Sequence, residues 1–425
     1  WDENGDESLR IYTNDEGATA SDRLLSLDTG QVDDNGDPSL TGVRYADLAW
    51  GDPDRDGDVD LVVSGMSAGG TSLSRLYTNE RGRLTLDEFN SEALLNVHNG
   101  DLAWADIDND GDLDLSISGE NVIADGGLAA VTEFYTNEPA GTLILEPGID
   151  LGTDAITGLS NQVKRGALSW SDFDGDGNLD LALSGRDAAL NAVLKIFRNR
   201  PAGTLSEDLN FSLNRFQRVD GGAHWIDYDN DGDDDLAVAG RTVLSDHRAL
   251  VFENRDGSLS GVSVEEEIEG LSGGPTLWGD YDGDGKADLL IAGVDADGQR
   301  RSILYSSRVA VANRSPEPPA SLNEVTATSQ RVLFSWAAGN DVESTNLSYN
   351  VRVGTEAGSQ DVLSAEVPLG PGNAGLKSDY VLESFLPPDT YFWSVQTIDG
   401  GLARSEFTSE GQFTVEQFVS SDQRL

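Results

Sequence analysis

The chain repeats one arrangement of apolar and polar positions, in which two short hydrophobic segments flank an acidic one. At residues 101–118, the segments "DLAW" and "LSIS" enclose the acidic segment "ADIDNDGDLD". Short runs of apolar and β-branched residues that are bounded by Gly and Asp are typical of β-strands. The pattern therefore predicts two strands joined by an acidic loop.

Five copies of this arrangement occur along the chain. Each copy opens on a tryptophan, and these are Trp50, Trp104, Trp170, Trp225 and Trp278. The first Asp of the acidic segment follows two residues later, and successive first Asp positions are 54, 66, 55 and 53 residues apart. One motif in each long period indicates a repeat architecture.

A second segment, rich in aromatic and β-branched residues, follows each copy at 75–79, 133–137, 195–199, 250–254 and 303–307. Its distance from the first segment is typical of a β-hairpin. A looser third strand, such as residues 82–89, and an apolar strand leading to the next tryptophan complete four strands. Units of four strands in series predict an all-β fold, a β-propeller with five full blades.

The N-terminal segment 8–14 matches the second segment, with Tyr12 at the aromatic position. Residues 1–30 are therefore expected to form only the outer half of another blade, and the complete propeller is expected to have six or seven blades. Because every blade edge must be paired, the missing inner strands would come from upstream sequence. Alternatively, another copy of the chain would supply them, which would build a homopolymeric filament.

Composition narrows the class of protein. The 425 residues include 48 Gly and only 38% apolar residues, which favours short strands and turns. No run of eighteen apolar residues occurs, so no transmembrane segment is expected. The net charge of −48 excludes a general nucleic-acid partner. The absence of cysteine excludes disulfides and thiol chemistry, so the acid excess points to bound metal as a source of stability.

Each acidic loop follows the pattern D-x-D-x-D-G-x-x-D. Alternate carboxylates in a tight loop converge on one point, and the Gly permits the positive φ that the turn needs. Such a set of oxygen ligands suits Ca²⁺ better than Mg²⁺, which demands a stricter octahedron. The seventh position varies and is expected to bind through its backbone carbonyl; it is Asp58, Asp112, Asn178, Asp233 or Lys286. The alternative, a solvated acidic turn without metal, does not explain one register kept five times.

An EF-hand would require a bidentate Glu at loop position twelve and a helix on each side. Position twelve is apolar in every copy, namely Val63, Ile117, Leu183, Val238 and Ile291. The flanking segments are short and predict strands. The sequence therefore excludes an EF-hand, and the Asp at the ninth position is expected to close the site.

The five loops resemble the FG-GAP family of calcium-binding propeller repeats, over residues 1–312, although the Phe-Gly/Gly-Ala-Pro signature of that family is weak here. The resemblance implies a calcium loop between the first two strands of each blade, with side-chain ligands at positions one, three, five and nine. About five Ca²⁺ are expected. The implied ligands are Asp52, Asp54, Asp56 and Asp60; Asp106, Asp108, Asp110 and Asp114; Asp172, Asp174, Asp176 and Asp180; Asp227, Asp229, Asp231 and Asp235; and Asp280, Asp282, Asp284 and Asp288.

Composition changes after the Pro-rich segment 313–322, which is expected to be a linker. Residues 323–418 resemble an immunoglobulin-like fibronectin type III sandwich. Trp336 would be the core tryptophan of an early strand, and Leu386 and Tyr391 match the Leu-x-Pro-x-x-Tyr corner, with Trp393 on the same strand. Residues 419–425 would form a C-terminal tail.

The sequence favours a secreted or cell-surface scaffold for adhesion or binding, with a protein or glycan ligand or with copies of itself. The structural subunit of a filament or surface layer is an alternative. A polysaccharide lyase or hydrolase is a second alternative, with His224 on an inner strand as its candidate residue. The repeat tryptophans are expected to pack blade against blade rather than to bind carbohydrate.

Overall fold

The structure is a computed structural model that describes residues 12–15, 24–27, 40–122, 127–138, 140–149, 151–152, 161–211, 219–242, 246–262, 268–310, 312–365 and 372–416. The regular secondary structure of the described residues is almost entirely β-strand, with one short helix, so the all-β prediction is confirmed. They contain no helix with the length and apolar character that a membrane crossing needs. The predicted tail at 419–425 and most of residues 1–30 lie outside the described part.

Each of the five repeats forms its own antiparallel sheet, with the strands side by side in chain order. Repeat 1 contains β3 (Arg44–Gly51), β4 (Asp60–Met66), β5 (Ser72–Glu80) and β6 (Arg83–Asp87). Repeat 2 contains β7 (His98–Ala105), β8 (Asp114–Val122), β9 (Leu128–Asn137) and β10 (Leu143–Leu145). Repeat 3 contains β11 (Leu168–Ser171), β12 (Asp180–Arg186), β13 (Ala192–Asn199) and β14 (Leu205–Glu207).

The last two repeats depart from the four-strand pattern. In repeat 4, two short segments together pair with the second strand; the strands are β15 (Val219–Asp220), β16 (Ala223–Ile226), β17 (Asp235–Thr242), β18 (His247–Arg255) and β19 (Ser258–Val262). Repeat 5 has three strands among its described residues, β20 (Thr276–Gly279), β21 (Asp288–Val294) and β22 (Arg300–Tyr305). A separate hairpin joins β1 (Tyr12–Asp15) to β2 (Leu24–Leu27).

The strand expected at 82–89 is shorter than predicted. It ends at Asp87, whose carboxylate accepts a hydrogen bond from the Asn90 backbone N–H at 3.0 Å. An Asp at this position caps the first turn of a helix, and helix α1 (Glu88–Ala93) follows. The local capping signal therefore overrides the strand pattern after Leu86.

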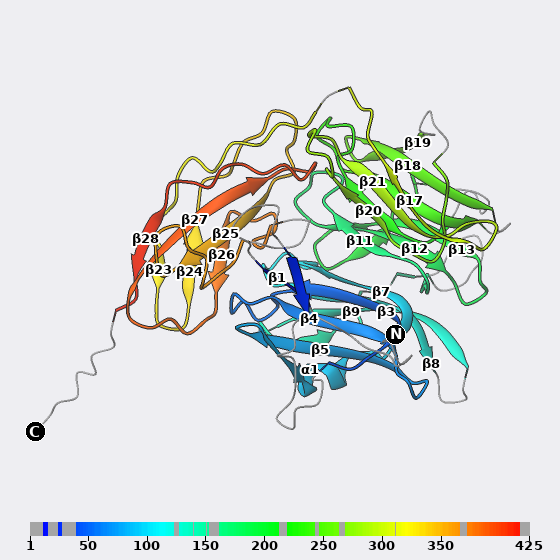
Figure 1. Ribbon diagram of the computed structural model, residues 1–425, viewed down its shortest axis with the longest axis horizontal. Helices are drawn as coiled ribbons and strands as arrows, with labels where there is room; N and C mark the ends of the chain where they lie inside the picture. The colour runs from blue at the N-terminus through cyan, green and yellow to red at the C-terminus, as the bar shows by residue number, and fades with distance from the viewer. Residues whose placement is uncertain are drawn as a thin grey trace, which may run out of the picture.

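Consecutive repeats pack through their inner strands, which lie next to one another (Figure 1). The Trp104 indole donates to the Ala49 carbonyl at 3.5 Å, and the Trp225 indole donates to the Ser169 carbonyl at 3.0 Å. In each case the tryptophan of one repeat contacts the inner strand of the preceding repeat. The prediction that the repeat tryptophans pack repeat against repeat is confirmed for Trp104 and Trp225, whereas Trp50 of repeat 1 is 38% exposed.

The second residue of an acidic loop is also buried in the interface with the next repeat. Ile107 is fully buried in the core of repeat 3. Phe173 stacks on Trp225 of repeat 4, with ring centroids 5.2 Å apart. Because these side chains lie between sheets, they fix the backbone of the loops from which they come.

The two outer sheets of the row each expose an apolar surface. In repeat 1, Leu48 is 45% exposed and Trp50 is 38% exposed, whereas the equivalent Leu102 of repeat 2 is buried. In repeat 5, Tyr281 is 59% exposed, although it occupies the position of buried Phe173. Among the described residues no sheet pairs repeat 5 with repeat 1, so a closed ring is not shown.

The C-terminal residues form two three-stranded sheets around a separate core (Figure 1). One sheet consists of β23 (Thr326–Ala327), β24 (Val332–Ser335) and β26 (Asp379–Leu382), and the other of β25 (Ser348–Gly354), β27 (Thr390–Ile398) and β28 (Gly411–Thr414). Trp336 and Trp393 are buried in this core, and the Tyr391 hydroxyl donates to the Pro387 carbonyl at 2.8 Å. We call this part the C-terminal sandwich.

Candidate metal centres

Each acidic loop connects the first two strands of its repeat, and its first Asp organises the turn. Asp172 accepts hydrogen bonds from the backbone N–H groups of Asp176 and Gly177, both at 2.9 Å. Asp52, Asp227 and Asp280 make the same pair of contacts in their own loops. Hydrogen bonds from the loop backbone therefore hold the first carboxylate in place without a metal ion.

The ninth-position Asp begins the second strand and is buried in every loop. One oxygen of Asp180 accepts the Asn199 backbone N–H at 2.7 Å. Equivalent bonds join Asp60 to Asn79, Asp114 to Asn137, Asp235 to Asn254 and Asp288 to Ser307. These bonds orient the carboxylate and leave its second oxygen directed toward the loop in Asp60 and Asp180, where that oxygen has no hydrogen-bond partner.

The predicted ligands come together in four of the loops. In each group, carboxylate oxygens from three residues all lie within 4.8 Å of one another. The groups are Asp52, Asp54 and Asp56; Asp106, Asp108 and Asp114; Asp172, Asp174 and Asp180; and Asp227, Asp229 and Asp235. A further group joins Asp108 and Asp110 to Glu138, an acid that the sequence pattern did not single out.

Several of these buried oxygens lack partners among the described residues. They are Asp60 Oδ2, Asp106 Oδ1, Asp180 Oδ2 and Asp229 Oδ1. A buried carboxylate oxygen without a hydrogen bond is unfavourable, and a bound cation removes that cost. All donors in these clusters are hard oxygens, the ligands that Ca²⁺ takes. The residues present therefore fit the ion that the sequence predicts.

Burial and mutual repulsion both disfavour the ionised form of these acids in the metal-free protein. Desolvation, followed by the charges of Asp54 and other loop acids, raises the pKa of Asp60 to about 9. The pKa of Asp235 is raised to about 9 and that of Asp114 to about 8, again mainly by desolvation. Acids arranged in this way hold protons until a cation replaces them.

The seventh-position side chains make bonds outside the clusters in three loops. Asp58 accepts the Arg81 backbone N–H at 2.9 Å, and Asp233 accepts the Asp256 backbone N–H at 2.7 Å. Asp112 forms an ion pair with Arg55 at 2.7 Å. In the remaining loops, Asn178 donates to Asp176 at 3.0 Å and Lys286 lies 3.3 Å from Asp284. These contacts fit the prediction that the seventh residue would bind the ion through its backbone carbonyl, and that prediction stays untested.

Loop 3 differs from the others because two arginines enter it. Arg198 and Arg200 both form ion pairs with Asp174, the latter at 2.6 Å, and Arg200 also pairs with Asp176. The corresponding residues of repeat 1 are Thr78 and Glu80. A cation in loop 3 must therefore compete with guanidinium groups for its ligands.

A residue that sequence reasoning missed supports the loops from outside. Asn199 is fully buried, and its side chain donates to the Ile107 carbonyl of the preceding repeat at 2.6 Å and to the Leu179 carbonyl at 3.0 Å. Asn137 and Asn254 make the same two bonds in repeats 2 and 4. The sequence does carry a signal for this residue, since Asn ends the second segment in four of five copies. The prediction of that strand rested on its aromatic residue instead.

The C-terminal sandwich contacts the metal loops directly. The Tyr380 hydroxyl donates to Asp52 Oδ2 at 3.1 Å, and the Glu383 N–H donates to the Arg55 carbonyl at 2.8 Å. Lys377 donates to the Asn109 carbonyl at 2.8 Å, with its Nζ 3.3 Å from Asp106 Oδ2.

The sandwich also contacts loops 3 and 4. Asn346 donates to the Asp172 carbonyl at 2.7 Å, and the Asp227 N–H donates to the Gly400 carbonyl at 3.3 Å. At Gly57, with φ of +100°, a Cβ would lie 2.4 Å from the Val362 carbonyl, so only glycine allows this approach. The sandwich therefore packs on the end of the repeats that carries loops 1 to 4.

His224, the candidate residue for an enzyme, lies on β16 opposite Ala237. Desolvation lowers its pKa. Within the described part of the chain, no hydrogen bond or ion pair joins its ring to an acid or base that could move a proton, and its Nδ1 is buried without a partner. The enzyme hypothesis gains no support from this position.

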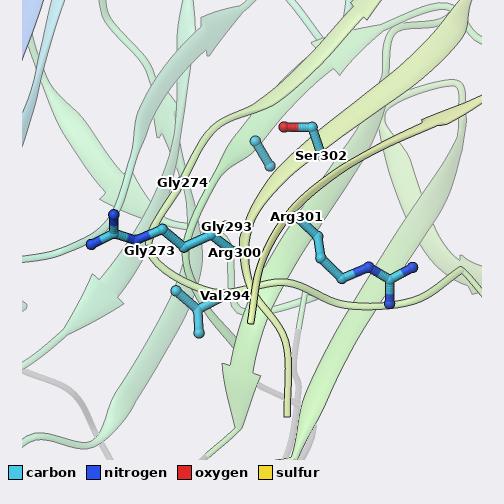
Figure 2. A pocket seen from close by; sticks show the side chains of 8 residues that line it. Gly273, Gly274, Gly293, Val294, Arg300, Arg301 and Ser302 are labelled. Carbon is cyan, nitrogen blue, oxygen red and sulfur yellow. The ribbon is translucent and has the colours of Figure 1, made fainter. Parts of the chain in front are cut away.

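A hollow of about 420 Å³ lies at the opposite end of repeat 5 from its metal loop. Gly273, Gly274 and Gly293 line it together with Arg300 and Arg301 (Figure 2). The two arginine side chains extend away from each other, so they do not converge on one ligand position.

Comparison with known proteins agrees with the repeat motif. The FG-GAP-like repeat family matches residues 172–238 and 227–291. FG-GAP-like repeats are therefore present in repeats 3 to 5. Curated proteins give no significant match to this chain.

The solved structures to which this chain is similar are only distantly so. A mutant of the Aleuria aurantia lectin in complex with alpha-methyl-L-fucoside has 8% identity and a TM-score of 0.35, over 90% of this chain and 99% of the lectin. A family 117 glycoside hydrolase of the marine bacterium Zobellia galactanivorans has 12% identity and a TM-score of 0.33, over 70% and 89% of the two chains. A mannose phosphorylase from Leishmania mexicana has 12% identity and a TM-score of 0.30, over 63% and 84%. The chain is thus an all-β protein with FG-GAP-like repeats.

Proposed function

We propose that this chain is a calcium-stabilised β-propeller that acts as an extracellular binding or adhesion scaffold. In this proposal residues 1–312 belong to the propeller, 313–322 link the two parts, and 323–418 form a fibronectin type III-like domain. The observation that supports calcium most strongly is the gathering of three carboxylates within 4.8 Å in each of four loops, with buried oxygens left without partners. The matching FG-GAP-like repeats support the same reading.

The metal in this proposal is structural. The loops lie between packed sheets and under the C-terminal sandwich, where a bound ion would fix Ile107 and Phe173 in the interfaces between repeats. A rigid row of sheets then presents its other end for a protein or glycan ligand. Fold alone does not name that ligand.

Calorimetric titration of the chelated protein tests the metal part of the proposal. Ca²⁺ should bind at several sites, up to about five, and Mg²⁺ should bind more weakly because it demands a regular octahedron. Failure of Ca²⁺ to bind the folded protein would overturn the proposal.

A second candidate function is the subunit of an extracellular filament. It is favoured by the exposed apolar surfaces of repeats 1 and 5. Exposed Tyr281 of repeat 5 occupies the position at which Phe173 of repeat 3 packs against the next repeat. Exposed Leu48 of repeat 1 occupies a position that is buried in repeat 2, where the preceding repeat packs on it. A second copy of the chain would join these surfaces head to tail. Light scattering over a concentration series tests this candidate, and a constant monomer mass at high concentration would exclude it.

A further inference from the structure

The ends of the inner strands opposite the metal loops carry an irregular backbone at one repeated position. Tyr45, Asn99 and Arg165 each lie five residues before the repeat tryptophan, and their φ angles are +51°, +51° and +57°. The strand register shifts at this position in repeats 1 and 2, which marks a β-bulge. A bulge redirects a side chain away from its regular place on the sheet.

The backbone of the repeat needs, at this position, only a residue that tolerates positive φ. Repeat 5 has Gly273 there, with φ of +73°, and glycine adopts this conformation without steric cost. Repeats 1 to 3 instead place Tyr, Asn and Arg, which are less suited to it. Strain at a non-glycine residue motivates a hypothesis of function, which the surrounding side chains must then support.

Ionisable side chains gather around these three residues. Glu120 is buried and accepts hydrogen bonds from Lys164 at 2.8 Å and from Asn99 at 2.7 Å. His98 is also buried, with its Nδ1 2.8 Å from Ser72 Oγ and its Nε2 3.6 Å from Glu120. The cluster joins repeats 1, 2 and 3.

A purely structural role explains the buried members of the cluster but not the exposed ones. Glu120 with Lys164 and His98 holds neighbouring repeats together. The Tyr45 side chain, however, is 60% exposed, and its hydroxyl has no hydrogen-bond partner among the described residues. The Arg165 side chain is 50% exposed, and its ion pair with Glu120 is long at 3.6 Å. These groups remain available to a ligand.

The exposed groups have the chemistry that recognises a sugar. The Tyr45 ring presents an apolar face. The centroid of this ring lies 6.5 Å from the centroid of the His98 ring and 6.0 Å from the guanidinium carbon of Arg44. An aromatic ring of this kind packs against the C–H face of a pyranose. Arg165 and Asn99 are joined by a backbone hydrogen bond at 2.7 Å and both contact Glu120. Their guanidinium N–H groups and side-chain oxygen supply donors and an acceptor for hydroxyl groups.

We propose that the bulged ends of repeats 1 to 3 form a saccharide-binding site, in which Tyr45 stacks on a pyranose ring and Asn99 and Arg165 hydrogen-bond its hydroxyl groups. The site deepens the proposed binding function and rests on it, because it names the class of ligand. Asn99 lies seven positions before Asp106, or about 20 Å along the strand. The contacts of the C-terminal sandwich with the described residues of repeats 1 to 4 lie at the loop end and not at this one.

Titration of the calcium-loaded full chain with two sets of oligosaccharides tests the site. One set consists of neutral oligomers of glucose, galactose and mannose, and the other of uronic acid oligomers. The two sets separate a neutral sugar from one whose carboxylate pairs with Arg165. Binding is expected in at least one set, and Tyr45→Gly and Arg165→Gly should each weaken it by about tenfold or more.

Glycine is chosen because it relieves the positive φ, so these variants should melt at or above the wild-type temperature. Arg81→Gly is the matched control, since Arg81 is exposed, has the same charge as Arg165 and has φ of +54° in the β5–β6 turn. The control should bind the saccharide like the wild type.

Two results would overturn the saccharide site. One is wild-type affinity in Tyr45→Gly, and the other is no binding of either set to protein that binds calcium. In the second case the calcium scaffold stands and only the ligand site fails. If the protein binds no calcium, the proposed function itself fails.

Discussion

At the scale of single residues, acids only two positions apart in one loop differ in their surroundings. Asp60 is buried, and its Oδ2 has no hydrogen-bond partner. Asp58 bonds to the Arg81 N–H on the outer side of the loop. Asp60 therefore has a carboxylate oxygen free to bind an ion, whereas the Asp58 carboxylate is bonded elsewhere, although both belong to the same sequence motif.

Asp60→Asn should remove one calcium site, because a direct ligand loses its charge. We expect the affinity of that loop to fall by about 100-fold, at the upper end of what loss of a supporting residue costs a metal site. In EDTA near neutral pH the variant should melt above the wild type, since folding of the metal-free wild type must protonate Asp60, whose pKa burial raises to about 9, and Asn has no such cost. Calorimetric titration and thermal melting measure the two effects.

Asp58→Asn is the control for that experiment. It makes the same chemical change in the same loop, at a position expected to bind through its carbonyl. Its calcium stoichiometry should match the wild type. Equal loss of a site in both variants would show that the ligand assignment is wrong.

The pKa values of the loop acids predict how pH affects the metal-free protein. Burial and neighbouring charges raise the pKa of Asp60 and of Asp235 to about 9, from the usual 3.8. The folded state thus holds protons that the unfolded state releases, and this contribution to stability is complete below pH 3.8 and is lost as pH rises through 9.

Calcium replaces those protons, so the increase in melting temperature that calcium gives over EDTA should grow between pH 5 and pH 9. Parallel melting curves with Ca²⁺ and with EDTA at each pH provide the measurement. A difference in melting temperature that does not change over this range would contradict the pKa shifts.

At the scale of elements, strand β13 of repeat 3 is connected to the preceding repeat through its last residue, Asn199. Asn199→Ala would remove both of its side-chain hydrogen bonds: the Leu179 carbonyl loses this donor, whereas the Ile107 carbonyl keeps the Gly203 N–H at 3.0 Å. We expect the free energy of unfolding to fall by about 1–3 kcal/mol, the cost of one buried group left without its hydrogen bond. Urea denaturation in calcium measures the change.

Ser307 occupies the same position in repeat 5 and provides the control. It contacts Asp288 through its backbone N–H, which the substitution Ser307→Ala retains. The control should lose less than about 1 kcal/mol. Equal effects at Asn199 and Ser307 would rule out the bridge between repeats.

Strands and loops were predictable from the sequence because their signals are local. The alternation around Trp104, the spacing to Tyr135 and the apolar residue at Ile117 identify two strands and exclude an EF-hand, and the structure buries Ile117 completely. The contact of Asn199 with Ile107 spans 92 residues. No local pattern encodes such a distance, because it depends on how sheets pack.

The bulge at Tyr45 and the arginines of loop 3 could not be predicted for the same reason. Their positive φ angles and ion pairs arise from the register between strands, not from residue type. Helix α1 shows a different limit, since the capping Asp87 competed with a strand pattern that was also present.

At the scale of the whole molecule, the C-terminal sandwich depends on the shape of the metal loops. Tyr380 and Lys377 contact Asp52 and Asp106, two of the proposed ligands. Chelation should allow the loops to expand by charge repulsion and so weaken these contacts. Small-angle scattering should then show a larger radius of gyration in EDTA than in calcium, and identical scattering curves would contradict this coupling.

Thermal unfolding of the full chain in calcium and in EDTA tests the central claim most directly. An ion that binds only the folded state must stabilise it, by about 2.7 kcal/mol for each site at one hundred times its dissociation constant. The account predicts a melting temperature that rises with calcium concentration and falls sharply in EDTA. A melting temperature that is the same in calcium and in EDTA would contradict it.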